Sequence, residues 1–193
     1  MIKVIAFDYA DVISPSSVSK WVRENLTPKD NKYHHYKKYS HKWDIGEMTL
    51  NEIYDALSHV TGIPDHLIWD NFYKNLDVDR EVIEIIIQLK KNYKVFLFSN
   101  YVGELLRKLL EKQKITNLFD EIIISSEHKL KKPDPEFFKI LTNKANVKND
   151  EILFIDDRLE NVEGAKNLGI NALQFIDSQK LLEDLKALNI KFI

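Results

Sequence analysis

Two short apolar segments of this chain end abruptly in aspartate. Ile2–Phe7 is followed by Asp8, and Ile152–Ile155 is followed by Asp156 and Asp157. Apolar runs of this length are typical of strands buried in a parallel sheet. Carboxylates at the ends of such strands face the crevice in which these sheets bind ligands. The two segments therefore predict an α/β fold with an acidic site at the carboxyl ends of its strands.

The rest of the chain alternates between strand-like and helix-like segments. Three further apolar runs have strand character: Lys94–Phe98, Glu121–Ile124 and Ala172–Phe175. Apolar residues at helical spacing occupy the segments between them: Val102–Lys114, Pro135–Ala145 and Asn161–Leu168. Strands that alternate with helices predict a doubly wound parallel sheet with right-handed crossovers.

The stretch between the first two predicted strands is too long for one crossover. It contains four segments of helical character: Val18–Leu26, 32–43, Leu50–Val60 and His66–Asn75. Thr49 is an N-cap candidate and Gly62 a helix end, while Asp79–Lys91 leads into the second strand. We therefore expect a core of residues 1–13 and 79–193, with residues 14–78 inserted as a helical cap above the strand ends.

The composition excludes several classes of protein. Of the 193 residues 44% are hydrophobic and 30% charged, which is an ordinary globular balance. A net charge of −2 does not indicate nucleic acid or a membrane surface as a partner. No apolar run approaches the roughly 20 residues of a membrane span, and the amino-terminal run is too short for a signal peptide. With no cysteine in the chain, we expect a protein of the reducing cytoplasm.

The acidic strand ends are suited to a metal. If the first and fourth strands are neighbours about 4.8 Å apart, Asp8 can share a cation with Asp156 and Asp157. Carboxylate oxygens are ligands that Mg²⁺ prefers, at about 2.1 Å. A carboxylate beside the metal can also act as a nucleophile. We therefore expect Mg²⁺ as a cofactor.

Two more polar groups lie between these aspartates in the chain. Ser99 and Asn100 close the second strand, and Lys132 precedes Pro133 in a loop before a helix. A residue before proline is held extended. A lysine directed at paired carboxylates would offset their repulsion and bind a phosphate oxygen.

Taken together, these four groups resemble the haloacid dehalogenase superfamily of phosphohydrolases, over the whole length of the chain. The resemblance rests on four motifs in order: Phe7–Ile13, Phe96–Asn100, Lys132–Phe138 and Phe154–Ala165. The insertion, with Trp43–Thr49, is similar to the small helical cap of the branch that contains glucose-1-phosphate phosphatases and the amino-terminal phosphatase of soluble epoxide hydrolases. The resemblance implies a Rossmann-like core.

The resemblance also implies roles for individual residues. Asp8 would attack phosphorus and form an aspartyl-phosphate. Asp8, the backbone carbonyl of Ala10 and Asp157 would hold Mg²⁺, with Asp156 supporting directly or through water.

The second and third motifs would hold the transferred group. Ser99, the backbone of Asn100 and Lys132 would bind the phosphoryl group and neutralise its charge, with Lys132 also counted as catalytic. Asn161 would steady the loop of the fourth motif. The expected partner is a small phosphorylated metabolite, with a sugar phosphate as the first choice.

Ala10 departs from the family pattern, because most of its phosphatases have an acid two residues after the nucleophile. Losing that proton transfer costs about 10²–10⁴-fold in rate. Three interpretations follow: a phosphatase that uses water or Asp11 instead, a protein that binds phosphate or a partner with little catalysis, and a haloacid dehalogenase. The retained Asp156 and Asp157 disfavour the dehalogenase, and we expect the phosphatase.

The segment 32–43 is the one biased stretch of the predicted cap. It interleaves Tyr33, Tyr36 and Tyr39 with Lys37, Lys38 and Lys42. Such interleaving can bind nucleic acid, but tyrosine at every third residue is more typical of one face of a helix with a solvated basic side. The histidines of this stretch lack acids at ligand spacing, so we expect surface or packing roles for His34, His35 and His41.

Overall fold

The computed structural model of the protein describes residues 1–14, 31–74 and 77–192. The predicted helix Val18–Leu26 lies outside these residues, as does Asn75. Within α2, the side chains of Tyr33, His35, Tyr36, Lys37 and Lys38 are also outside the description.

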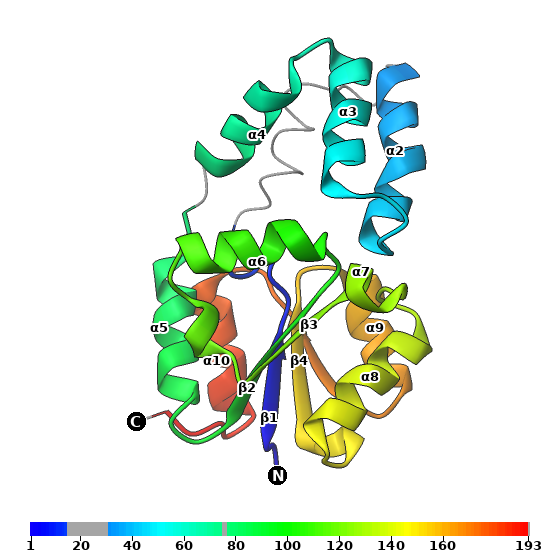
Figure 1. The fold of residues 1–193 in the computed structure, drawn as a ribbon. Coiled ribbons are helices and arrows are strands. Elements are labelled where there is room, and N and C mark those ends of the chain that lie inside the picture. Colours follow the sequence, from blue (N-terminus) through cyan, green and yellow to red (C-terminus); the bar gives the residue numbers. More distant parts are fainter. Residues whose placement is uncertain (15–30, 75–76, 193) are drawn as a thin grey trace.

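Five parallel strands form one sheet in the order β3-β2-β1-β4-β5. Their bounds are β1 Val4–Phe7, β2 Lys94–Ser99, β3 Glu121–Ile124, β4 Ile152–Asp156 and β5 Asn171–Gln174. The chain first builds outward from β1 to β3 and then returns to the other side of β1. The order therefore reverses at β1, and the doubly wound α/β fold that the sequence predicts is confirmed (Figure 1).

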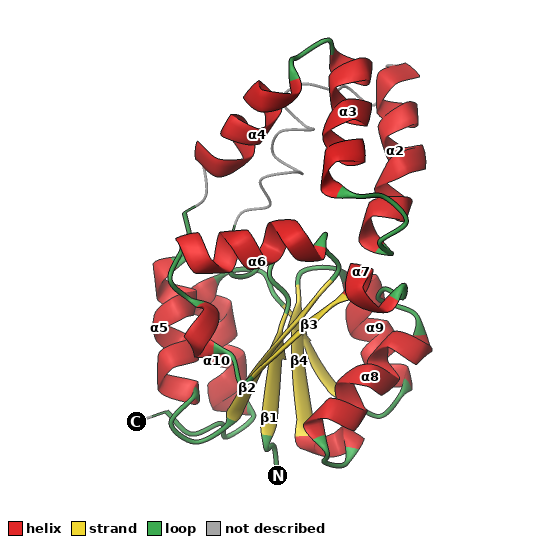
Figure 2. Ribbon diagram, viewed as in Figure 1, coloured by secondary structure: helices red, strands yellow, loops and turns green. Residues whose placement is uncertain are grey.

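Helices cover both faces of the sheet because its strands are apolar on both faces (Figure 2). Ile5 and Phe7 of β1 pack in the cluster that holds α5 (Arg80–Leu89), α6 (Gly103–Lys112) and α10 (Ser178–Ala187). Val4 and Ala6 point the other way, into the cluster of α8 (Pro135–Ala145) and α9 (Leu159–Asn167). The alternation follows the period of two along a strand.

Within the described part of the segment between β1 and α5, three helices, which we call the cap helices, lie beyond the carboxyl ends of the strands (Figure 1). They are α2 (Asn31–Asp44), α3 (Leu50–Thr61) and α4 (Asp65–Lys74). Thr49 and Glu52 form a capping box at the start of α3, and Gly62 ends it at a φ of 75°. These two signals place the ends of α3 where the sequence predicts them. None of the helices in the described ranges is long and apolar enough for a membrane span.

The predicted elements that fall within the described residues recur with ends shifted by at most two residues. The largest shift on a strand is at β1, whose ladder begins at Val4 rather than Ile2. Two α-helices have no counterpart in the sequence pattern as interpreted: the short α7 (Ser125–His128) and α10. The first of these helices begins at Ser125, whose hydroxyl donates to the Asp44 carbonyl at the end of α2.

Candidate active site

The sheet brings together the three aspartates that the sequence places at strand ends. Phe7 of β1 lies beside Ile155 of β4, and the backbone N–H of Asp8 donates to the Ile155 carbonyl at 2.9 Å. Asp8 directly follows β1 and Asp156 ends β4, so the two aspartates lie at the ends of neighbouring strands. One carboxylate oxygen from each of Asp8, Asp156 and Asp157 lies within 4.8 Å of the others.

Lys132 reaches into this group from the loop before α8. Its side chain has no exposed surface, and its Nζ lies 3.1 Å from an Asp8 oxygen and 2.6 Å from an Asp156 oxygen. Nζ also donates to the Phe98 carbonyl at 2.9 Å. The rings of Phe98 and Phe154 lie 5.4 and 5.1 Å from it, which adds cation–π attraction. The ammonium is thus fixed between two strand ends.

Asn100 sets the position of the loop that carries Lys132. The Lys132 N–H donates to Asn100 Oδ1 at 2.8 Å, and Asn100 Nδ2 donates to the Lys132 carbonyl at 2.9 Å. Just beyond, the Asp134 side chain caps α8 by accepting from the Glu136 N–H at 2.9 Å. The side chain of Asn100 therefore aligns the loop, while its backbone is the part for which the family resemblance implies a phosphoryl contact.

Asp156 differs from its two neighbours because its oxygens already accept several hydrogen bonds. Oδ1 accepts from the Arg158 N–H at 2.9 Å and from Asn161 Nδ2 at 2.9 Å. Oδ2 accepts from Lys132 at 2.6 Å and from Asn161 at 3.0 Å. A carboxylate has about four acceptor sites, and these hydrogen bonds leave little capacity for a further ligand. Asp156 thus orients Lys132 and the start of α9, and Asp8 and Asp157 are the freer oxygen donors.

A tight turn follows Asp8. The Tyr9 N–H donates to Asp8 Oδ1 at 2.8 Å, and the Tyr9 carbonyl accepts from Ile13 at 2.9 Å and Ser14 at 3.1 Å. These bonds use the Tyr9 carbonyl, so the Ala10 carbonyl is not the acceptor that closes the turn. The Ala10 side chain is partly buried against the apolar cluster, and Asp11 is exposed with a left-handed φ of 57°.

Ser99 supplies a hydroxyl at the end of β2. The residue is fully buried, and among the described residues its Oγ has no hydrogen-bond partner of normal geometry. Burial raises the pKa of Asp8, and Ser99 lies near enough to that carboxyl to lower it. A buried polar atom without a partner is costly. A ligand oxygen next to Asp8 would satisfy it.

The electrostatics of the site favour a bound cation. Burial raises the pKa of Asp8 to about 7, against the lowering effect of Lys132. Burial, and then the charges of Asp156 and Asp11, raise the pKa of Asp157 to about 6. For Lys132, the two carboxylates outweigh burial and raise the pKa. One ammonium cannot balance three carboxylates, so the donor set fits a divalent ion with oxygen ligands.

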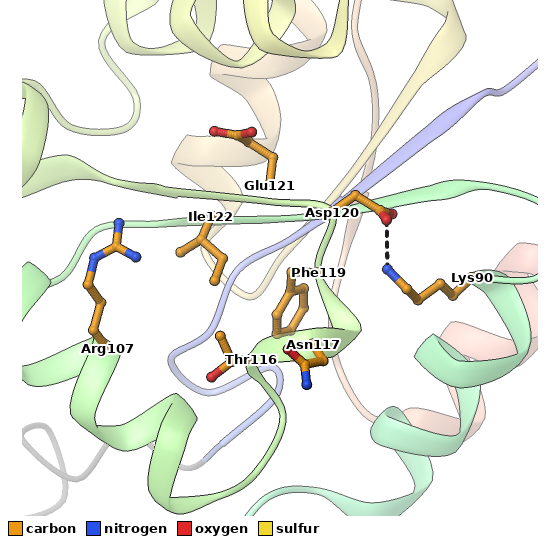
Figure 3. A pocket seen from close by; sticks show the side chains of 8 residues that line it. All are labelled: Lys90, Arg107, Thr116, Asn117, Phe119, Asp120, Glu121 and Ile122. Atoms are coloured by element: carbon orange, nitrogen blue, oxygen red, sulfur yellow. Dashed lines mark hydrogen bonds and ion pairs between the residues drawn. The ribbon is translucent and has the colours of Figure 1, made fainter.

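A hollow of about 490 Å³ elsewhere on the surface lacks this character (Figure 3). It lies at the amino end of β3, the end opposite to the aspartates, and Arg107, Thr116 and Ile122 contribute to its lining. Its Lys90 is paired with Asp120 at 2.7 Å. The hollow is therefore separate from the candidate active site.

Comparison with known proteins now identifies the family. A model of the family described as haloacid dehalogenase-like hydrolase matches residues 2–175. The chain belongs to this family of hydrolases. The resemblance that the four motifs carry is thereby confirmed.

Relatives and solved structures agree with this assignment. Sesquiterpene phosphatase astK of Aspergillus oryzae is 26% identical over 151 residues, which cover 76% of this chain and 77% of the relative. D-ribitol-5-phosphate phosphatase of Bacteroides thetaiotaomicron is 25% identical over 192 residues, covering 90% and 92%. A HAD family enzyme of Bacteroides thetaiotaomicron, crystallised with magnesium and inorganic phosphate, has a TM-score of 0.77 at 22% identity over 94% of this chain and 99% of that one. The last similarity shows the shared fold.

The sequence predicts the charged residues of the site but not the groups that align them. The Phe98 carbonyl and the paired amide bonds of Asn100 hold Lys132. A backbone carbonyl has no residue signature, and the Asn100 contact depends on loop geometry. The contact of Asp44 with Lys131, described below, was missed for the same reason.

Proposed function

We propose that the protein is a Mg²⁺-dependent phosphatase of small phosphomonoesters that acts through an aspartyl-phosphate on Asp8. The observation that carries this proposal is the buried Lys132, which contacts Asp8 and Asp156 beside the freer carboxylate of Asp157. Asp8, Asp157 and the Ala10 carbonyl would hold the metal. Bound there, Mg²⁺ would neutralise charge on the transferring phosphoryl group.

The residues of the chain then divide the work as follows. An Asp8 oxygen forms a bond to phosphorus as the bond from phosphorus to the leaving oxygen breaks. Lys132 and the Ser99 hydroxyl bind oxygens of the phosphoryl group, where charge develops. The leaving oxygen takes a proton from water or from Asp11. Water then attacks phosphorus, which releases inorganic phosphate and regenerates Asp8.

The substrate class proposed first is the sugar and sugar-alcohol phosphates. The support is the relative named D-ribitol-5-phosphate phosphatase, because the match covers 90% of this chain and 92% of that relative. Residues 14–78 would form the cap that closes over such a substrate, because the cap helices lie beyond the strand ends (Figure 1). The absence of cysteine fits an enzyme of the cytoplasm.

A phosphatase screen with and without Mg²⁺ tests the proposal. The panel contains sugar phosphates, a terpenoid monophosphate, p-nitrophenyl phosphate and 2-haloacids. We expect phosphate release that requires Mg²⁺. Halide release without metal would favour a dehalogenase, and tight binding of inorganic phosphate without turnover of any ester would favour a binding protein that has lost catalysis.

A further inference from the structure

The turn at residues 44–46, which we call the anchor turn, joins the end of α2 to the core. The backbone carbonyl of Asp44 accepts a hydrogen bond from the Ser125 hydroxyl at the start of α7. Ser125 is fully buried, and its Oγ also accepts from the Tyr101 N–H at 3.0 Å. Tyr101 directly follows Asn100. One buried hydroxyl thus connects the cap helices to the loop that aligns Lys132.

Gly46 shows how closely the anchor turn approaches the core. Its φ is 68°, and a Cβ added there would lie 2.3 Å from the Ser126 carbonyl oxygen. That distance is shorter than any normal contact. Only glycine fits both the backbone conformation and the space, so the approach of the turn to α7 is tight and specific.

The Asp44 side chain makes a second connection, to the loop of the third motif. One of its oxygens lies 3.1 Å from Lys131 Nζ, and the two side chains are 31% and 28% exposed. Burial raises the pKa of Asp44, and Lys131 lowers it, as does Arg158 more weakly. Asp44 is therefore paired with Lys131, the neighbour of Lys132 in the chain, and the charge of Arg158, the neighbour of Asp157, also acts on it.

These contacts converge on the residues that align the site. Lys131 precedes Lys132, whose backbone is held on both sides by Asn100. The anchor turn thus contacts the second-motif loop through Ser125 and the third-motif loop through Lys131. Misplacement of a reacting group by about 1 Å can cost about 10²-fold in rate.

We infer that Asp44 is a positioning residue for phosphoryl transfer, which acts through Lys131 to fix Lys132 against Asp8. The inference deepens the proposed function and rests on it. Asp44 touches neither the reacting atoms nor the metal ligands. Its removal should therefore weaken the grip of Lys132 on the phosphoryl group without removing any reacting group.

A double-mutant cycle tests this inference. Asp44→Asn keeps the size and loses the charge, and Lys131→Met keeps the stem and loses the ammonium. We expect each to lower kcat/KM about 10-fold, mainly in kcat, and to weaken binding of inorganic phosphate in the presence of Mg²⁺ to a similar degree. The kcat/KM of the double variant should be no lower than that of the more impaired single variant. Asp44→Glu should restore part of the loss.

Glu121→Gln is the matched control. It breaks a half-exposed ion pair with Lys144 of 2.8 Å on the core, away from the site. We expect this control to leave kcat/KM and phosphate binding unchanged even if it lowers Tm as much as Asp44→Asn does. A role of Asp44 in stability alone would therefore move Tm and nothing else.

Two results would overturn the inference. One is wild-type kcat/KM and phosphate affinity in both single variants, within about twofold. The other is a double variant whose loss equals the product of the single losses, because independent sites are additive. Neither result bears on the proposed function. That function would fail if the wild-type protein released no phosphate, or if the Asp8→Asn variant released it as fast as the wild type. The phosphate-binding arm tests the inference even then.

Discussion

At the scale of single residues, the site is organised around a lysine whose side chain is fully buried. Lys132 is fixed by two carboxylates and a carbonyl, so its ammonium has a set position before any substrate binds. Preorganised charge of this kind is what phosphoryl transfer requires, since the protein contributes mainly position and electrostatics. Ala10 is the exception in this site, because its side chain offers no proton to a leaving group.

Ala10→Asp tests that departure. If the leaving oxygen lacks a proton donor, the variant should raise kcat/KM by about 10²-fold for alkyl phosphates. For p-nitrophenyl phosphate, whose leaving group needs no proton, the gain should be small. The measurement is steady-state kinetics on both substrates, with Ala10→Asn as the control of similar size. No gain on alkyl phosphates would show that another group already donates the proton, and an equal gain on both substrates would show that the gain does not come from proton donation.

The residues of the site divide by how much of them the sequence could predict. The sequence predicts four of these residues, because Asp8, Asp156 and Asp157 lie at strand ends and Lys132 precedes a proline. Such local patterns can be recognised without knowledge of the rest of the fold. The structure brings these residues together, while the roles assigned to them remain predictions. The side-chain bonds of Asn100 depend on how two loops meet in space, which local patterns do not encode.

At the scale of elements, strand ends and helix caps hold the active-site loops in place. Asp79, which lies between the cap helices and α5, shows this. Its carboxylate accepts from the N–H groups of Glu81 and Val82 at 3.0 and 3.1 Å, and its own N–H donates to the Ile13 carbonyl at 2.8 Å. The start of α5 is thereby tied to the turn that follows Asp8.

Asp79→Ala should therefore destabilise the protein. Loss of an N-cap acceptor costs about 1 kcal/mol of the free energy of unfolding. Asp79→Asn keeps an acceptor oxygen and should cost less. Urea unfolding of the three proteins measures the difference. Equal stability of Asp79→Ala and the wild type would mean that the cap contributes nothing.

Helices that lie between predicted strands and carry local signals are predicted from the sequence, whereas α7 and α10 are not. Gly62 and Thr49 mark the ends of α3 because capping is a local interaction. The helix α10 also has such signals, the Asp177 cap and the buried pair Leu181 and Leu185. These signals lie beyond the last strand, where no helix is needed to connect one strand to the next. The four-residue α7 has too few turns to show a period.

At the scale of the whole molecule, the acidic edge of the sheet links metal binding to stability. Asp8, Asp156 and Asp157 repel one another in the folded protein, and Lys132 offsets only part of this. Unfolding would separate them. A divalent cation at the site should therefore stabilise the fold.

Thermal unfolding with and without Mg²⁺ measures this linkage. At a concentration of about 100 times Kd, a ligand that binds only the folded state adds about 2.7 kcal/mol to the free energy of unfolding. For a chain of this size that is a rise in Tm of about 5–10 °C. Asp157→Asn should remove most of the rise. The site assignment would be wrong if the wild type showed no shift, or if Asp157→Asn shifted equally.

The central claim is that Asp8 is the nucleophile of a phosphatase. The most direct measurement is phosphate release by Asp8→Asn beside the wild-type protein, at saturating Mg²⁺ and on the best substrate of the screen. Asn keeps the shape and removes the charged oxygen, so we predict a loss of kcat of about 10³-fold or more, with Tm confirming that the variant is folded. Activity of Asp8→Asn within about tenfold of the wild type would contradict the mechanism.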